Sequence, residues 1–248
     1  MPAELRTFII ALYALLIGSV WTSPAAAQTA ITVDPATAVE AASASVALNH
    51  TVGNGGDRYL IVSVAIERND ATVNAITYAG QPLSLLGRRT DPGVGATLEI
   101  WGRLAPTSGT NQLAVTLSNS AAVVVGAMSF ANVNQTNAIA AGPLLSTGNG
   151  TTASGSIASA TDQLVIGMIA ANDEVGLVIA GVGQTSRWNV VNAADVIGAA
   201  STSTGSATST TMSYTLANSG RWVLGVIALQ QANPLIVSNT NDSGAGSL

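Results

Sequence analysis

The chain has no cysteine, no lysine and a single histidine, and only 8% of its 248 residues are charged. Without cysteine there is no disulfide scaffold, so an apolar core has to hold the fold together. One histidine and no cysteine also exclude an ordinary zinc site. The formal net charge is −5 and arginine is the only cationic residue type, so the basic surface that nucleic-acid binding requires is missing. We expect no nucleic-acid partner.

The first residues, MPAELRTFIIALYALLIGSVWTSPAAAQ, have the composition of a secretory leader. A short start with one arginine precedes an apolar run at 8–20, and three alanines follow at 25–27. This run is shorter than the roughly 20 residues that a membrane-spanning helix needs, so a signal peptide over 1–27 is the better interpretation. We expect cleavage before Gln28, a secreted or cell-surface location and no membrane span. Residues 28–42 would form an N-terminal leader segment of the mature chain.

Short runs in which apolar residues alternate with small or polar ones recur between Gly, Asn, Asp and Pro, and this period of two is typical of β-strands. In RYLIVSVAIER, the side chains of Leu60, Val62, Val64 and Ile66 share one face, which we expect to face the core, while the intervening side chains lie on the other face. The predicted fold class is all-β, a two-sheet antiparallel sandwich, jelly-roll-like, over 43–232. Further strands are predicted at 45–52, 73–78, 83–89, 96–104, 112–117, 122–130, 163–171, 177–182, 187–191, 195–201, 210–216 and 221–229.

Several segments resemble one another at an offset of about 100 residues, such as DRYLIVSVAIERND with TDQLVIGMIAANDE and LAVTLSNSAAVVVGAMSF with MSYTLANSGRWVLGVIAL. Either half of the chain is duplicated, or one strand pattern is used twice because every sandwich strand meets the same inside–outside constraint. We favour the second explanation. Two low-complexity stretches remain: 146–160 is expected to link the halves, and 199–211 to form a hairpin of Ser/Thr-rich edge strands with Gly205 near its turn.

Aromatic residues make up 4% of the chain, so their positions are informative. In TLEIWGRLA, alternation places Glu99, Trp101 and Arg103 on the same face. This pattern makes Trp101 a candidate sugar-stacking platform, with Glu99, Arg103 and Tyr59 as further ligand-binding candidates. The alternative, which we favour, is that Trp101 packs structurally under Arg103 or the N-terminal segment. Trp188 is expected to pack in the core.

His50 is the only histidine, so a Ser-His-Asp mechanism would have to use it as the base. No GxSxG motif accompanies it, and its place in the alternating run LNHTVG favours a structural role. We assign no catalytic residue and do not expect an enzyme. Asp70, Asp173 and Glu174 stand in presumed loops, where their oxygens are candidate calcium ligands without EF-hand spacing. Local hydrogen bonds in turns are the alternative use of these residues, and no cofactor other than calcium is considered.

Four segments together, NHTVGNGGDRYLIVSVAIE, VNAITYAGQPLSLLG, LEIWGRLAPTSGTNQLAVTLS and VVVGAMSFANVNQT, resemble a β-sandwich domain that recurs in large secreted bacterial proteins. The terminal VSNTNDSGAGSL resembles the opening of right-handed parallel β-helix modules of bacterial surface proteins, of the polymorphic outer-membrane and autotransporter-like type. The first resemblance implies architecture and carries no catalytic residues. The second implies that 233–248 is a linker and the truncated start of a β-helix module.

The function expected from these observations is that of a non-catalytic extracellular or cell-surface module of a larger bacterial protein, serving adhesion, display or spacing. The alternative is a carbohydrate-binding module, accessory to a polysaccharide-active enzyme. A glycan or another cell-surface ligand is the expected outside partner, and the β-helix module is the expected neighbour in the same chain.

Overall fold

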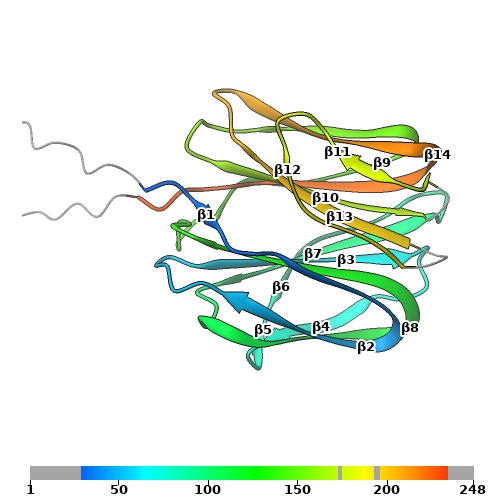
Figure 1. The fold of residues 1–248 in the computed structure, drawn as a ribbon, viewed down its shortest axis with the longest axis horizontal. Helices are drawn as coiled ribbons and strands as arrows, with labels where there is room; N and C mark the ends of the chain where they lie inside the picture. The colour runs from blue at the N-terminus through cyan, green and yellow to red at the C-terminus, as the bar shows by residue number, and fades with distance from the viewer. Residues whose placement is uncertain (1–28, 173–174, 193–195, 234–248) are drawn as a thin grey trace, which may run out of the picture. The chain divides into compact units, whose positions relative to one another are not determined.

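The computed structural model describes residues 29–172, 175–192 and 196–233. Every regular element among them is a β-strand, and the strands form two antiparallel sheets (Figure 1). The predicted all-β sandwich class is confirmed. The signal peptide predicted over 1–27 lies outside the described residues, and so do all but the first residue of the linker and β-helix start predicted over 233–248. In the part of the chain that is described, no helix is long and apolar enough to cross a membrane.

The first sheet is built from the first half of the chain. Its strands are β1 (Thr32–Val33), β2 (Thr37–Val52), β3 (Tyr59–Glu67), β4 (Val73–Tyr78), β5 (Gln81–Pro82), β6 (Ser84–Thr90), β7 (Ala96–Leu104) and β8 (Gly109–Ala131). Their order is β5-β4-β8-β3-β7-β6, and β1 and β2 also pair with β8. Because β2 begins at Thr37, part of the predicted leader segment 28–42 already belongs to the sheet.

The second sheet is built from the second half of the chain. Its strands are β9 (Ile139–Ala158), β10 (Leu164–Asn172), β11 (Val178–Ala180), β12 (Thr185–Asn192), β13 (Val196–Thr204) and β14 (Ser209–Leu229). Their order is β11-β14-β10-β13-β12, and β9 also pairs with β14. The fold shares its two antiparallel sheets with a jelly roll. The path of the chain differs, because each sheet is built from one half of the chain.

The two longest strands, β8 and β14, make each sheet turn back on itself. In β8, the part before exposed residues 118–120 pairs with β4, and the part after them pairs with β3. On the opposite edge β2 follows β8 along both parts. Strand β14 is divided in the same way: its first part pairs with β11 and its second part pairs with β10. Strand β9 pairs with both parts of β14 along the opposite edge. The predictions had two strands in place of each long one, divided where the bend lies.

The two sheets repeat one arrangement. Strands β2, β3, β4, β6, β7 and β8 correspond to β9, β10, β11, β12, β13 and β14 in pairing. Even an irregularity corresponds, since the register of β6 with β7 shifts between Leu85 and Gly87, and that of β12 with β13 between Ser186 and Trp188. An inside–outside constraint explains alternation, but it does not fix strand order or bulge position. The structure therefore supports a duplicated half, which was the less favoured explanation.

Two expectations for the low-complexity stretches are wrong. Residues 146–160, predicted as a linker, lie almost entirely in β9, which pairs along most of β14. Residues 199–211, predicted as a hairpin, connect β13 to β14, but those two strands do not pair with each other. Both pair with β10 instead, which lies between them. Small Ser, Thr and Gly residues alone do not distinguish a long strand from a linker.

Three apolar clusters fill the fold. The central core lies between the two sheets and includes Ile61 and Ala65 of β3 together with Ile166 and Ala170 of β10. Each outer core is enclosed by the curled part of one sheet. Burial of an aliphatic side chain contributes about 1.5–3 kcal/mol, so these clusters stabilise the fold without disulfides.

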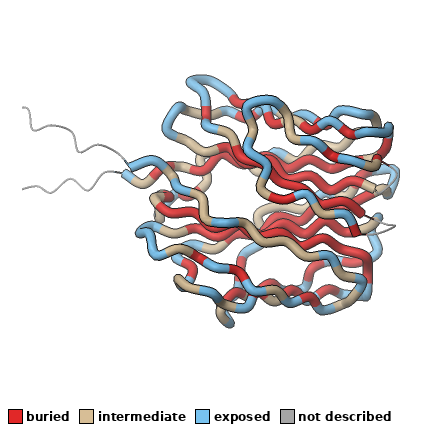
Figure 2. The backbone as a smooth tube through the Cα atoms, in the orientation of Figure 1, coloured by how far each residue is buried: buried red, intermediate tan, exposed pale blue. Residues whose placement is uncertain are grey.

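Strand β3 is buried on both faces (Figure 2). Leu60, Val62 and Val64 are fully buried in the first outer core, so the predicted core face is right. The other face is buried as well, because Ile61 and Ala65 pack in the central core. The curl of the first sheet covers one face of β3, and the second sheet covers the other.

Close packing of the sheets depends on a glycine in β8. A Cβ at Gly126 would lie 2.2 Å from the ring of Trp188, which reaches across from β12. Trp188 is buried in the central core, as predicted. A side chain at position 126 must therefore displace the indole or separate the sheets.

Candidate functional site

Trp101 does not form a surface platform. Its side chain is part of the first outer core, and the residue is 8% exposed. The indole Nε1–H donates a hydrogen bond of 3.1 Å to Oε2 of Glu99. Alternation correctly places Glu99 and Trp101 on one face of β7, but the curled sheet covers that face. The expectation of a solvent-facing Trp101 is therefore wrong, because the indole packs inside the first outer core.

Glu99 is a buried carboxylate whose oxygens are occupied by protein donors. Its Oε1 accepts hydrogen bonds of 3.1 Å from the backbone N–H of Val73 and from Nε of Arg88, with which it forms an ion pair. Arg88 also donates to Oδ1 of Asn69 at 2.6 Å. A buried charge is tolerated only when it is paired and hydrogen-bonded. Glu99 thus connects β4, β6 and β7 within the fold.

Tyr59 and Arg103 are the two predicted ligand residues that line a common cleft, which also includes Leu104 and has a volume of about 380 Å³. Tyr59 is 4% exposed, and burial raises the pKa of its hydroxyl to about 12. Nη1 of Arg103 donates to the carbonyl oxygen of Pro82 at 2.6 Å. The aromatic ring is therefore packed within the central core and offers little stacking surface.

The predicted calcium ligands are not brought together in the described part of the chain. Asp70 lies in a turn, where its backbone N–H donates to the carbonyl of Glu67 at 3.3 Å and its own carbonyl accepts from Asn119. Asp173 and Glu174 lie outside the described residues. Among the residues that the structure describes, no three Asp, Glu, His or Cys side chains form a group able to hold a metal ion.

His50 is fully buried and hydrogen-bonded at both ring nitrogens. Nδ1 lies 2.9 Å from Oγ1 of Thr37, and Nε2 lies 3.2 Å from Oγ of Ser129. Ser129 donates its hydroxyl proton to Oδ2 of Asp34 at 2.6 Å, so its oxygen accepts from Nε2–H and Nδ1 accepts from Thr37. The ring of Tyr78 packs edge-on against the imidazole. Burial lowers the pKa of His50 to about 4, although the charge of Asp34 acts in the opposite direction.

The hydrogen-bonded residues Thr37, His50, Ser129 and Asp34, which we call the polar chain, connect the ends of strands in the first curled sheet. Thr37 begins β2, His50 lies near its end, and Ser129 lies near the end of β8. The strand pairing places Ile157 and Ala228 at the corresponding positions of the second sheet. The same fold is therefore built there with an apolar pair, and the polar chain is a property of the first half alone.

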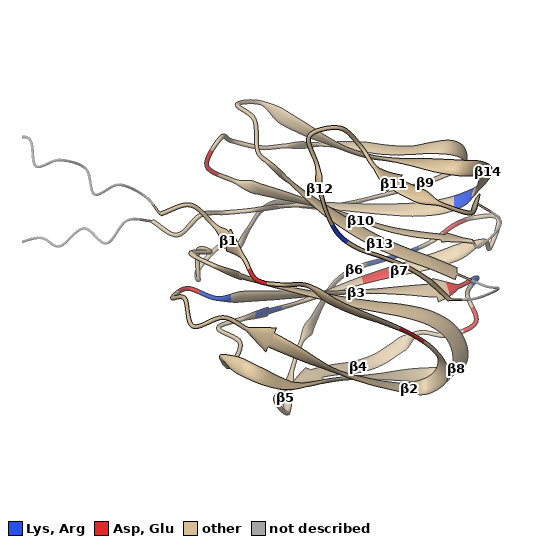
Figure 3. Ribbon diagram, viewed as in Figure 1, with Lys and Arg blue, Asp and Glu red and all other residues tan. Residues whose placement is uncertain are grey.

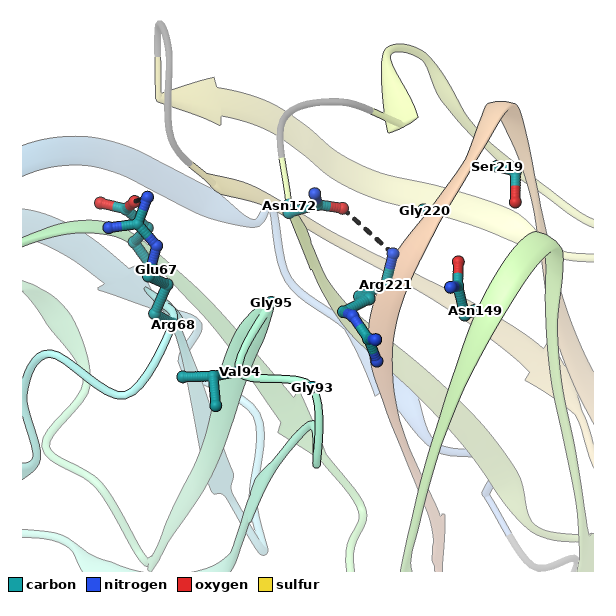
Figure 4. Close-up of a pocket in the computed structure, with 10 residues that line it drawn as sticks. All are labelled: Glu67, Arg68, Gly93, Val94, Gly95, Asn149, Asn172, Ser219, Gly220 and Arg221. Carbon is teal, nitrogen blue, oxygen red and sulfur yellow. Dashed lines mark hydrogen bonds and ion pairs between the residues drawn. The ribbon is translucent and has the colours of Figure 1, made fainter.

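A polar cleft of about 490 Å³ lies at the end of the molecule where β3 and β10 finish (Figure 4). We call it the end cleft. The first sheet contributes the ends of β3 and the turn between β6 and β7, and the second contributes β9, β10 and β14. Its lining residues are Glu67, Arg68, Gly93, Val94, Gly95, Asn149, Asn172, Ser219, Gly220 and Arg221.

Arg221, which lines the end cleft, forms an ion pair between the two sheets. Nη1 of Arg221 lies 3.2 Å from Oδ2 of the buried Asp91. The same carboxylate oxygen accepts from the backbone N–H groups of Gly93 and Gly95, at 3.0 and 3.3 Å. The backbone N–H of Arg221 donates to Oδ1 of Asn172 at 3.1 Å. Both ends of the Arg221 residue are thus fixed by hydrogen bonds.

None of the predicted ligand-binding residues, which were Trp101, Glu99, Arg103 and Tyr59, lines the end cleft. One signal was present: LANSGR in the second half matches LSNSAA in the first, so Arg221 stands where its counterpart is Ala122. An arginine in an otherwise uncharged repeated strand marks a position with its own role.

Comparison with known protein families, with curated proteins and with solved structures found no match to this chain.

Proposed function

We propose that this chain is a non-catalytic β-sandwich module, exported and presented outside the cell as part of a larger bacterial protein, where it serves adhesion, display or spacing. The observation that carries the proposal is that the side chains best suited to catalysis are hydrogen-bonded to other residues within the fold. The only histidine and, among the described residues, the most buried carboxylates, Glu99 and Asp91, are bound to partners inside the fold. They connect strands and do not converge on a reaction site.

The surface supports the same proposal. The strands β8 and β9, which are 23 and 20 residues long, contain no charged residue (Figure 3). Many of their exposed positions carry Ser or Thr, and some of these hydroxyls bond across strands, as Ser156 and Thr211 do at 2.7 Å. A rigid body with three apolar cores and a weakly charged exterior suits a spacer that has to persist without disulfides.

Export is tested by producing the full chain in a bacterial host, fractionating the cells and sequencing the N-terminus of the product. The mature protein should begin at Gln28 and be found outside the cytoplasm. A cytoplasmic product that retains Met1 would contradict the proposal.

The non-catalytic assignment is tested by incubating the mature chain with a panel of esters and polysaccharides. We expect no turnover. Hydrolysis that disappears in His50→Gln and Ser129→Ala variants which remain folded would show that the buried polar chain is catalytic, and the assignment would be wrong.

A further inference from the structure

We propose that the end cleft binds a neutral, hydroxyl-rich glycan. This inference rests on the proposed role in adhesion or display and names the ligand class for it. The glycan site expected at Trp101 was an aromatic stacking platform. The end cleft is a polar surface, which would bind the hydroxyl groups of a sugar through hydrogen bonds.

The lining of the end cleft is polar, and Val94 is the only lining residue with an aliphatic side chain. Asn149 and Ser219 come from the second sheet and are exposed; each can both donate and accept. Glu67 adds acceptors and Arg68 adds donors from the first sheet. A sugar hydroxyl also donates and accepts, so a surface of mixed donors and acceptors matches several hydroxyls on one ring.

The charges of the end cleft are balanced. Nη2 of Arg68 lies 3.2 Å from Oε1 of Glu67, and Arg221 is paired with Asp91. An anionic ligand would have to approach two carboxylates together with the two guanidinium groups, so its charge would gain little. A neutral ligand meets no such opposition, and this balance is the reason for preferring neutral glycans to acidic ones.

Arg221 is prepared for contact with a ligand before binding. A Cβ at Gly93 would lie 1.8 Å from the guanidinium carbon, and one at Gly95 would lie 2.5 Å from Cβ of Arg221, so the arginine lies directly over the glycine turn. Its side chain is nevertheless 41% exposed. Because the group is already held in place, binding has little side-chain ordering to overcome.

The volume of about 490 Å³ also fits a small ligand, since small-molecule sites measure roughly 300–1,000 Å³. The cleft lies between two duplicated halves, and it is lined by the strand ends of both. Clefts between packed units are common places for binding sites.

The test is a binding titration of the mature full chain by calorimetry or NMR. The neutral panel consists of short cello-, manno-, xylo- and chito-oligosaccharides, and the acidic panel of short oligouronates. Both panels are measured at low and at high salt. We expect binding by at least one neutral oligosaccharide, with little dependence on salt because no ionic contact is formed.

The site is tested by the double variant Asn149→Ala with Ser219→Ala, both at exposed positions outside the three apolar clusters. Loss of one hydrogen bond weakens binding about fivefold, so the pair should weaken it about 25-fold. The matched control is Asn49→Ala with Ser120→Ala, at exposed positions of β2 and β8; Ser120 is the counterpart of Ser219 in the first half. The control variant should bind as the unaltered chain does.

Preference for oligouronates with strong salt dependence would overturn the neutral class. Neutral binding that both double variants retain would overturn the location. Binding by neither panel would overturn the inference as a whole while leaving the export proposal intact, because export is measured independently of any ligand.

Discussion

Acidification should destabilise this protein through its single histidine. His50 is fully buried, and the neutral ring is the form that its partners Thr37 and Ser129 accommodate. Burial lowers its pKa in the folded protein to about 4, against 6.5 for the exposed side chain. In the unfolded chain the ring takes up a proton at the ordinary pKa, so the unfolded state binds more protons between these two values.

The sign and the size of the effect follow from that difference. The contribution of His50 to stability is fully present above pH 6.5, declines as the pH falls, and is lost near pH 4. A tenfold change in proton affinity corresponds to about 1.4 kcal/mol, so the difference between 6.5 and about 4 amounts to about 3 kcal/mol. That loss is a sizeable part of the 5–15 kcal/mol that stabilises a typical domain.

The assay is urea unfolding of the mature chain between pH 7.5 and 4, without a histidine tag. The comparison is the double variant His50→Ile with Ser129→Ala, which installs the residue types found at the corresponding Ile157 and Ala228 of the second sheet. We expect the unaltered chain to lose about 3 kcal/mol more than the variant over this range.

Because the sequence has one histidine, its imidazole NMR signal reports the same group directly. A titration midpoint near 6.5 in the folded protein would refute the reasoning, and so would equal pH dependence of the free energy of unfolding in the two chains.

Three further changes test the packing by urea unfolding. Glu99→Ala removes the ion-pair partner of Arg88 and leaves the indole N–H of Trp101 and the backbone N–H of Val73 without their acceptor, so it should cost about 3 kcal/mol, while the isosteric Glu99→Gln should cost less; equal losses would contradict the charge pairing. Gly126→Ala should cost about 1–3 kcal/mol, with part regained when Trp188→Leu is added, and no regain would show that the two sites are independent. Arg221→Ala should cost about 1 kcal/mol through loss of the half-exposed pair with Asp91, and no change would mean that this ion pair does not help to hold the sheets together.

One aspect of the polar sites was open to prediction from local pattern. Alternation correctly put Glu99 and Trp101 on one face of β7, because successive side chains of a strand point in opposite directions. It could not tell whether that face meets water. The bend of β8 at 118–120 brings β4 over this face, and a bend is decided by which distant strands pair with β8. The end cleft was hidden for the same reason, since its residues come from both halves.

The sequence by itself determined the class of the fold, the positions of most strands and the recurrence of one pattern in both halves, because these follow from side-chain alternation and turn residues within short stretches. Only the tertiary structure decided that β3 is buried on both faces, that His50, Ser129 and Asp34 form one chain of hydrogen bonds, and that Arg221 meets Asp91 across the sheets. Those results depend on long-range strand pairing and on the packing of one sheet against another, which local periodicity does not specify.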